Sequence, residues 1–314
     1  MSALSEERLA PANGIEIAYQ EVGDPDGEPL LLVMGLATQM LAWDEVFCAM
    51  LAQRGFRVVR FDNRDIGGST MIDSAGVPRR ADMLLGRRRT AAYLLREMAA
   101  DTTGLMDRLG IESAHLVGAS MGGMIAQTVA IYRPQRVRSL VSIMSSTGNR
   151  WQGLPAWRAF RTLFARPGEG REAAIEHTLR TFRTIGSPGY PMDEPRIRAL
   201  AGASYDRSHS RAGVARQLHA LTASGDRTAA LERLRLPATI LHGGSDPLIR
   251  PAAGRATAKA IRDSRLRVFD GMGHDFPRQL WPEFVEEIAN TAARAQRFGP
   301  TNSSSVATSA LRET

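Results

Sequence analysis

The sequence of 314 residues predicts an α/β protein, with a mostly parallel central sheet, helices on both of its faces and an inserted helical cap. Three observations lead to this fold class. Short apolar runs alternate with helical stretches in the first half of the chain and again near its end, as parallel strands joined by helices do. One apolar run leads through a serine turn flanked by glycines into a helix. Residues 147–235 contain no strand-like run.

The expected strands are short apolar runs at residues 29–34, 57–61, 114–117, 137–144, 237–242 and 266–269. Helices are expected at residues 43–54, 123–130, 171–184, 195–203 and 279–297. Turns rich in proline and glycine separate the helices of the insertion. These elements predict a core of residues 1–146 and 236–298, a helical cap of residues 147–235, and a disordered tail of residues 299–314, which is rich in Ser, Thr and Ala.

The serine turn is the most informative element. Residues 118–122 read Gly-Ala-Ser-Met-Gly, a G-x-S-x-G pattern between a strand and a helix. In that setting a strained turn lifts the hydroxyl of Ser120 clear of the sheet, and a side chain at Gly118 or Gly122 would clash with the neighbouring segment. The amide of Met121, at the start of the helix, points to where an oxyanion would form. In a chain with 29 glycines the pattern alone is weak evidence, so partner residues must support it.

A serine hydroxyl needs a base that is itself held by an acid. Asp246 lies in the loop after the strand expected at residues 237–242, and His274 lies in a glycine-flanked loop after the strand expected at residues 266–269. The order Ser, Asp, His, with each residue at a strand end, is the order that such a turn requires. We therefore predict Ser120 as nucleophile, His274 as base and Asp246 as the acid that orients it.

Other residues compete for the two partner roles. His115 lies within a strand, and His242 directly precedes the loop of the acid. The remaining histidines, His177, His209 and His219, fall in the insertion. Asp270 and Asp275 rival Asp246, but they are neighbours of His274 in sequence and are expected to cap or turn the chain around it.

The second oxyanion donor should follow an early strand. The amide of Leu36 is the candidate, because Gly35 lets the chain approach the substrate closely. The predicted substrate-binding residues flank the site: Met34, Gly35, Met124 and Met272. Methionines there suggest an adaptable apolar pocket, although methionine also fills ordinary cores. The larger apolar residues of the insertion are expected mostly to pack the cap onto the core: Trp151, Trp157, Phe160, Phe164, Phe182 and Tyr190.

Four motifs in order carry a family resemblance: Met34-Gly35, the Asp-Asn-Arg-Asp-Ile-Gly-Gly-Ser run at residues 62–69, the serine turn, and the Asp246 and His274 loops. From about residue 10 to residue 297 the chain resembles the α/β-hydrolase family, and within it serine esterases of the aclacinomycin methylesterase-like subgroup. The resemblance implies the α/β-hydrolase fold and acyl transfer through a covalent intermediate. One departure is Met34, which replaces a histidine that in most relatives hydrogen-bonds and stiffens the oxyanion loop.

Two charged segments have simpler explanations than ligand binding. Asp62 and Arg64 could clamp a substrate carboxylate, but we favour an internal salt bridge and turn behind the site, which would fix the loop. The basic run Arg87 to Arg89 is expected to open a solvated helix. The net charge is +7, yet all but one of the 40 basic residues are arginine and they are spread along the chain. This pattern argues against nucleic-acid binding.

Composition agrees with a soluble globular protein, with 43% hydrophobic and 23% charged residues. No apolar run is long enough to span a bilayer, and the N-terminus lacks an apolar signal segment, so a cytoplasmic location is expected. The single cysteine, Cys48, is expected to be a small core residue in the helix at residues 43–54.

The predicted function is hydrolysis of a carboxylic ester of a small or medium apolar substrate through an acyl-enzyme, without a metal or cofactor. Carbon–carbon bond or lactone hydrolysis, or a serine perhydrolase reaction, could use the same triad. A protein of another class, which binds a small ligand without catalysis, is a further alternative. The natural substrate and the oligomeric state stay open, a homo-oligomer included.

Overall fold

The computed structural model describes residues 4–152, 155–165 and 168–297. One eight-stranded sheet forms its centre, in the spatial order β1-β2-β4-β3-β5-β6-β7-β8. The strands are β1 (Arg8–Ala12), β2 (Ile15–Val22), β3 (Glu28–Val33), β4 (Phe56–Phe61), β5 (Ala114–Ala119), β6 (Val137–Ile143), β7 (Ala238–Gly243) and β8 (Arg265–Phe269). Strand β2 runs antiparallel to β1 and β4, and all other neighbours are parallel. The predicted fold class is thereby confirmed.

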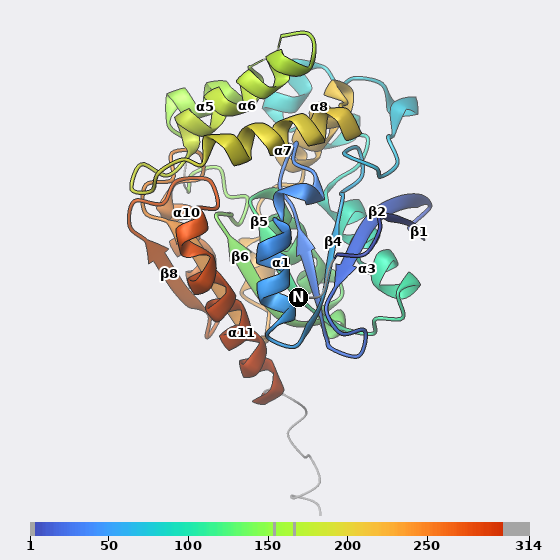
Figure 1. Ribbon diagram of the computed structural model, residues 1–314, viewed down its shortest axis with the longest axis vertical. Coiled ribbons are helices and arrows are strands. Elements are labelled where there is room, and N and C mark those ends of the chain that lie inside the picture. Colours follow the sequence, from blue (N-terminus) through green and yellow to red (C-terminus); the bar gives the residue numbers. More distant parts are fainter. Residues whose placement is uncertain (1–3, 153–154, 166–167, 298–314) are drawn as a thin grey trace, which may run out of the picture.

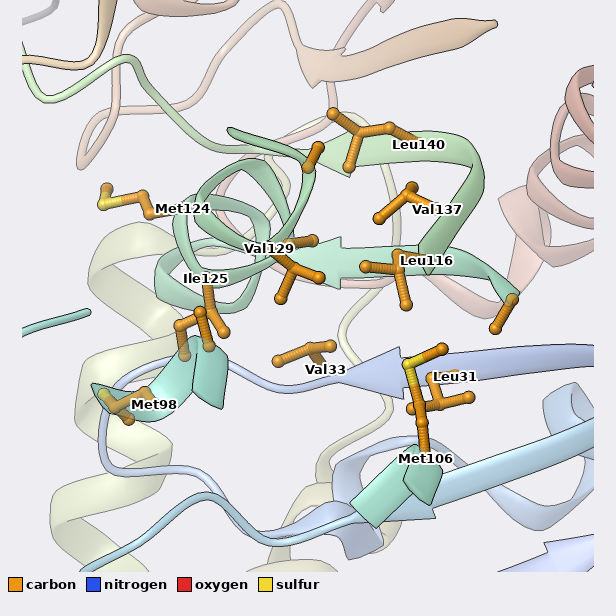
Figure 2. Packing of buried hydrophobic residues seen from close by; sticks show 14 of the residues in the cluster. Leu31, Val33, Met98, Met106, Leu116, Met124, Ile125, Val129, Val137 and Leu140 are labelled. Atoms are coloured by element: carbon orange, nitrogen blue, oxygen red, sulfur yellow. The ribbon is translucent and has the colours of Figure 1, made fainter. Parts of the chain in front are cut away.

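Helices cover both faces of the sheet. The apolar side chains of α1 (Glu45–Ala52) and α11 (Trp281–Arg297) share one buried cluster with strand residues such as Leu32 and Val141. The second cluster holds side chains of α3 (Leu95–Arg108), α4 (Met121–Tyr132) and the end of α10 (Pro251–Ala260). Figure 2 shows Ile125 and Val129 of α4 gathered there with residues of β3, β5 and β6. Two packed layers therefore hold the strand ends in fixed positions.

The chain between β6 and β7 forms helices only, as far as it is described. They are α5 (Trp157–Phe164), α6 (Arg171–Ile185), α7 (Glu194–Arg207), α8 (Arg211–Ala223) and α9 (Thr228–Leu231). Figure 1 shows α5 to α8 together at one end of the sheet. Helix α2 (Arg80–Leu85), between β4 and α3, packs against α8. The carboxyl ends of the parallel strands face this group of helices, because α8 contacts the turn that follows β3.

Three details differ from the expectations. The antiparallel hairpin of β1 and β2 was not predicted. The arginines from Arg87 to Arg89 do not open a long helix; they lie in an exposed turn with the 3-10 helix Arg88–Thr90. Trp151 and Trp157 do not pack onto the core, since 88% and 71% of their surfaces are exposed.

The remaining large apolar residues of the insertion differ in their outcomes. Tyr190 packs against the cluster of α1 and α11, as expected, whereas Phe182 packs in a small cluster between α6 and α7, within the insertion. The side chains of Phe160 and Phe164 and the tail predicted at residues 299–314 lie outside the described residues.

Candidate active site

Ser120 occupies the turn between β5 and α4 in a strained conformation. Its backbone angles are φ +54° and ψ −119°, a region that residues with a side chain rarely adopt. Hydrogen bonds fix the turn on both sides of this residue. The Ser120 N–H donates to the Ile143 carbonyl at 2.9 Å, and the Ser120 carbonyl accepts from the Ser145 hydroxyl at 2.8 Å. The tertiary structure therefore supports a conformation that a free turn would avoid.

The two glycines of the motif are required by close backbone contacts. A Cβ atom on Gly118 would lie 2.2 Å from the Gly122 carbonyl oxygen, and one on Gly122 would lie 2.0 Å from the Val33 carbonyl oxygen. No side chain fits at either position. The chain can therefore pass from β5 into α4 tightly enough to present Ser120 at the end of the sheet.

Ser120, His274 and Asp246 form one hydrogen-bonded series. His274 Nδ1 lies 2.7 Å from Asp246 Oδ2, and His274 Nε2 lies 3.0 Å from Ser120 Oγ. A carboxylate only accepts, so Nδ1 carries the proton and Nε2 is free to accept the serine proton. The structure thus brings together all three residues predicted for the reaction. Such a series can move a proton from the hydroxyl to the imidazole while the carboxylate stabilises the resulting charge.

The loop after β7 holds Asp246 in place. Its Oδ1 accepts hydrogen bonds from the Leu248 and Ile249 amides at 2.8 and 2.9 Å, and its side chain is fully buried. His242, at the end of β7, donates through Nε2 to the Ile249 carbonyl at 2.7 Å. Hydrogen bonds with both Asp246 and His242 therefore hold the backbone of this loop. Burial lowers the pKa of His242, although its hydrogen bond to Ile249 opposes the shift.

Among the described residues, the His274 imidazole pairs with Asp246 and with neither rival carboxylate. Asp270 is exposed at the surface. Asp275 accepts a hydrogen bond from the hydroxyl of Ser187, in the connection between α6 and α7, and burial raises the pKa of its carboxyl. The Gly273 amide donates to the same hydroxyl at 2.8 Å, and the His274 amide donates to the Ile185 carbonyl at 2.7 Å. The histidine loop is thus attached to the inserted helices.

The turn after β3 passes directly beside Ser120. A Cβ atom on Gly35 would lie 3.1 Å from the Cβ of Ser120. Among the described residues, neither the Leu36 amide nor the Met121 amide has a hydrogen-bond acceptor. Two N–H groups near one serine, left without partners, can bind an oxyanion.

Two side chains that sequence reasoning missed fasten this turn. The Asn63 side-chain amide donates to the Met34 carbonyl at 2.8 Å, and the Gln217 side chain in α8 accepts from the Ala37 amide at 3.1 Å. The turn is therefore anchored even though Met34 supplies no polar side chain. Asn63 belongs to the run at residues 62–69 and could have been suspected, but no local signal marked Gln217.

The run at residues 62–69 is an internal ion-pair region, as favoured, but with partners other than those expected. Asp62 pairs with Arg207 of α7 at 2.5 Å, while Arg64 pairs with Asp101 of α3 at 2.5 and 2.6 Å. Asp65 binds Arg216 of α8 at 2.7 and 2.8 Å. Two of the three pairs therefore join the core to the inserted helices.

The predicted pocket methionines are buried in the two apolar clusters. Met34 and Met272 lie in the cluster of α1 and α11, and Met124 lies in the other. Cys48 is fully buried, and burial raises the pKa of its thiol to about 12. Within the described ranges, no three His, Cys, Asp or Glu side chains are grouped to hold a metal ion. None of the described helices has the length and apolar character needed to cross a membrane.

Comparison with known proteins identifies the family and supports the fold. Residues 28–277 match the family model described as the alpha/beta hydrolase fold. The chain is 26% identical over 291 residues to a rhodomycin D methylesterase of Streptomyces peucetius, covering 86% of this chain and 92% of the relative. It is 26% identical over 261 residues to 3-oxoadipate enol-lactonase 2 of Acinetobacter baylyi, covering 82% and 86%.

A solved esterase from Rhodococcus sp. superimposes with a TM-score of 0.69 at 22% identity, covering 92% of this chain and 99% of the esterase. At this identity the likeness concerns the fold. The sequence relatives thus include a methylesterase and an enol-lactonase.

Proposed function

Because this chain belongs to the alpha/beta hydrolase fold family, we propose that it hydrolyses a carboxylic ester of a small or medium apolar substrate through an acyl-enzyme on Ser120. The observation that carries the proposal is the hydrogen-bonded series from Ser120 through His274 to Asp246. A serine in a strained turn, next to an imidazole that can accept its proton, is equipped for nucleophilic attack.

In the first half of the proposed reaction, Ser120 Oγ attacks the ester carbonyl while its proton passes to His274 Nε2. Asp246 stabilises the imidazolium that forms. The tetrahedral intermediate collapses, the bond to the alcohol oxygen breaks, and His274 gives its proton to the departing alcohol. In the second half His274 takes a proton from water, the hydroxide attacks the acyl carbon, and Ser120 leaves with the proton returned by His274.

The Leu36 and Met121 amides are the proposed oxyanion donors. Both lie beside Ser120 without an acceptor in the described part of the chain, so they are free to bind the negative oxygen as it develops. Losing one such donor typically costs about 3 kcal/mol of transition-state stabilisation. Backbone donors suit this role because the turns that carry them are fixed before substrate arrives.

We further propose that residues 147–235 form a cap over a core made of residues 1–146 and 236–298. Support comes from α7 and α8, which pair with Asp62 and Asp65 beside the strand ends. A cap in this place would exclude water and shape the pocket. Gly35 and the methionines Met34, Met124 and Met272 are proposed to form its apolar wall near Ser120. The proposed partner is a small-molecule ester, and the proposed location is the cytoplasm.

Hydrolysis of a lactone is the second candidate function. The enol-lactonase relative supports it, since a lactone is a cyclic ester and the same attack on its carbonyl opens the ring. The methylesterase relatives support a small alcohol as the leaving group. Methyl esters and lactones therefore belong in the same substrate screen.

The test is active-site labelling with a fluorophosphonate together with turnover of p-nitrophenyl esters, methyl esters and lactones. The wild-type protein should be labelled on Ser120 and should hydrolyse at least one class. Ser120→Ala should lose both activities, whereas Ser264→Ala, a matched change in the loop before β8, should keep both. Labelling retained by Ser120→Ala would reject the nucleophile. A wild-type protein that neither labels nor turns over would favour the non-catalytic alternative.

A further inference from the structure

The turn that carries the Leu36 amide continues through a residue in an unfavourable backbone conformation. Ala37 has a φ of +60°, in the left-handed region. For a residue with a Cβ this conformation costs roughly 1 kcal/mol, so other contacts must hold it. Those contacts fix the peptide plane between Leu36 and Ala37, and with it the turn that presents the Leu36 N–H.

Gln217 supplies that contact from α8. Its Oε1 accepts the Ala37 N–H at 3.1 Å, and its Nε2 donates to the Arg64 carbonyl at 2.7 Å. The side chain is fully buried. Because one end of the carboxamide must accept and the other must donate, only one orientation satisfies both partners. Gln217 therefore acts as a rigid link between the turn after β3 and the turn after β4.

Helix α8 itself has little freedom at this point. Arg216, the neighbour of Gln217, binds Asp65 with two hydrogen bonds, and both side chains are at most 1% exposed. One turn earlier, a Cβ atom on Gly213 would lie 2.2 Å from the Asp65 carbonyl oxygen. The helix backbone therefore lies directly on the core turn, and the position of Gln217 is set by it.

The two neighbouring amides of the turn differ in their hydrogen bonding. The Ala37 N–H is bound to Gln217, while the Leu36 N–H has no acceptor among the described residues. Without Gln217, the Ala37 N–H would lose its acceptor and the left-handed conformation would lose its support. The turn would then be free to move the Leu36 N–H away from Ser120.

We propose that Gln217 is a positioning residue, through which the inserted helix α8 holds the Leu36 amide in place for the oxyanion. This inference rests on the proposed ester hydrolysis at Ser120. It makes α8 a part of the apparatus that stabilises the transition state, in addition to any role in enclosing substrate.

The experiment compares Gln217→Met with the wild type. Methionine has a similar length, but its side chain replaces neither the hydrogen bond to the Ala37 amide nor the one to the Arg64 carbonyl. We expect kcat/KM for a p-nitrophenyl ester to fall about 10-fold to 100-fold, because a misplaced donor loses much of its effect. KM should change less than about threefold, since the interaction is made only in the transition state. The inhibition constant of a trifluoromethyl ketone, which forms an oxyanion on Ser120, should rise by the same factor as kcat/KM falls.

Ser224→Ala is the matched control. Ser224 directly follows the last residue of α8 and accepts a hydrogen bond from the Leu95 amide at 2.9 Å, so this change also removes a contact between the α8 segment and the core. It does not touch the turn after β3. Activity and inhibitor affinity of Ser224→Ala should equal those of the wild type.

Gln217→Glu gives a second, independent readout. A protonated glutamic acid has the same donor and acceptor as glutamine, whereas a glutamate cannot donate to the Arg64 carbonyl. The ratio of Gln217→Glu to wild-type kcat/KM should therefore rise as the pH is lowered. This ratio decides the question if Gln217→Met does not fold.

Three outcomes would overturn the proposal. They are a Gln217→Met enzyme with unchanged kcat/KM, an equal loss in Ser224→Ala, and a loss of kcat with unchanged ketone affinity. Failure of the underlying ester hydrolysis looks different, because the wild-type protein would then show no turnover and no label on Ser120.

Discussion

The hydroxyl of Ser187 donates a hydrogen bond to the carboxylate of Asp275, the residue that directly follows His274. The same hydroxyl accepts from the Gly273 amide at 2.8 Å. A single side chain from the connection between α6 and α7 thus holds the residues on both sides of the proposed base.

Ser187→Ala should therefore impair catalysis. The change leaves the Gly273 amide and the Asp275 carboxyl without this partner, and the loop that carries His274 should loosen. The loss of one or two such bonds should lower kcat/KM about tenfold. Thr184→Val, an exposed change near the end of α6 and just before this connection, is the control and should behave as the wild type. Equal kcat/KM values for Ser187→Ala and the wild type would contradict the role of this contact.

His274→Ala should lower kcat by several orders of magnitude, about 10³-fold or more, as removal of a triad base usually does. Asp246→Asn should also be severely impaired, because its amide can present a donor to His274 Nδ1 and favour the wrong tautomer. Both variants should keep the far-ultraviolet circular dichroism spectrum of the wild type. Near-normal ester turnover by His274→Ala would mean that another histidine is the base.

Arg216→Ala should destabilise the protein strongly. The variant leaves the buried carboxylate of Asp65 without its cation, and breaking a buried pair in this way costs about 3–5 kcal/mol. Arg198→Ala removes an arginine that is 41% exposed and pairs with Glu172 and Glu176 at the surface, so it should change the free energy of unfolding far less. Urea unfolding of the two variants measures the difference. Similar losses in both would show that burial does not set the strength of the Asp65 pair.

His242→Gln should flatten the pH dependence of stability. Burial lowers the pKa of His242 in the folded protein, whereas in the unfolded chain the imidazole takes up a proton near pH 6.5. Below that pH the unfolded state binds more protons, so wild-type stability falls as the pH drops. The contribution of this one site is at most about 1.4 kcal/mol per pH unit. Glutamine keeps a donor for the Ile249 carbonyl and does not titrate.

Urea unfolding between pH 5.5 and pH 8 would measure both slopes. The wild type should lose more free energy of unfolding toward acid than His242→Gln does. Parallel curves would contradict a neutral His242 in the folded protein.

The parts of the site that the sequence predicts are those carried by short segments. The serine turn is recognisable in the sequence because Gly118, Ser120 and Gly122 lie within five consecutive residues. The close contacts that require the two glycines arise within that turn and with the neighbouring strand. Asp246 and His274 are identifiable because a parallel sheet brings strand ends to one edge.

The contacts through which the inserted helices hold the turns around the site could not be predicted in the same way. Gln217 meets Ala37 across 180 residues, and Arg216 meets Asp65 across 151. Such pairs depend on how the inserted helices lie on the core, which no local pattern encodes. The sequence showed that Met34 has no polar side chain to hold the turn after β3. It did not show that hydrogen bonds with Asn63 and Gln217 anchor this turn instead. For the same reason the exposure of Trp151 and Trp157 was missed, because hydrophobicity alone does not reveal which face of a helix or loop is covered.

The pairs of Asp62 with Arg207 and of Asp65 with Arg216 restrict how this enzyme can be recombined with its relatives. A chimera that grafted a foreign insertion onto this core would leave two fully buried carboxylates uncompensated, unless the graft carried arginines at the matching places. Substrate range in this scaffold should accordingly be altered by redesigning the surface that the proposed cap would turn toward substrate, with Arg207 and Arg216 retained as fixed attachment points.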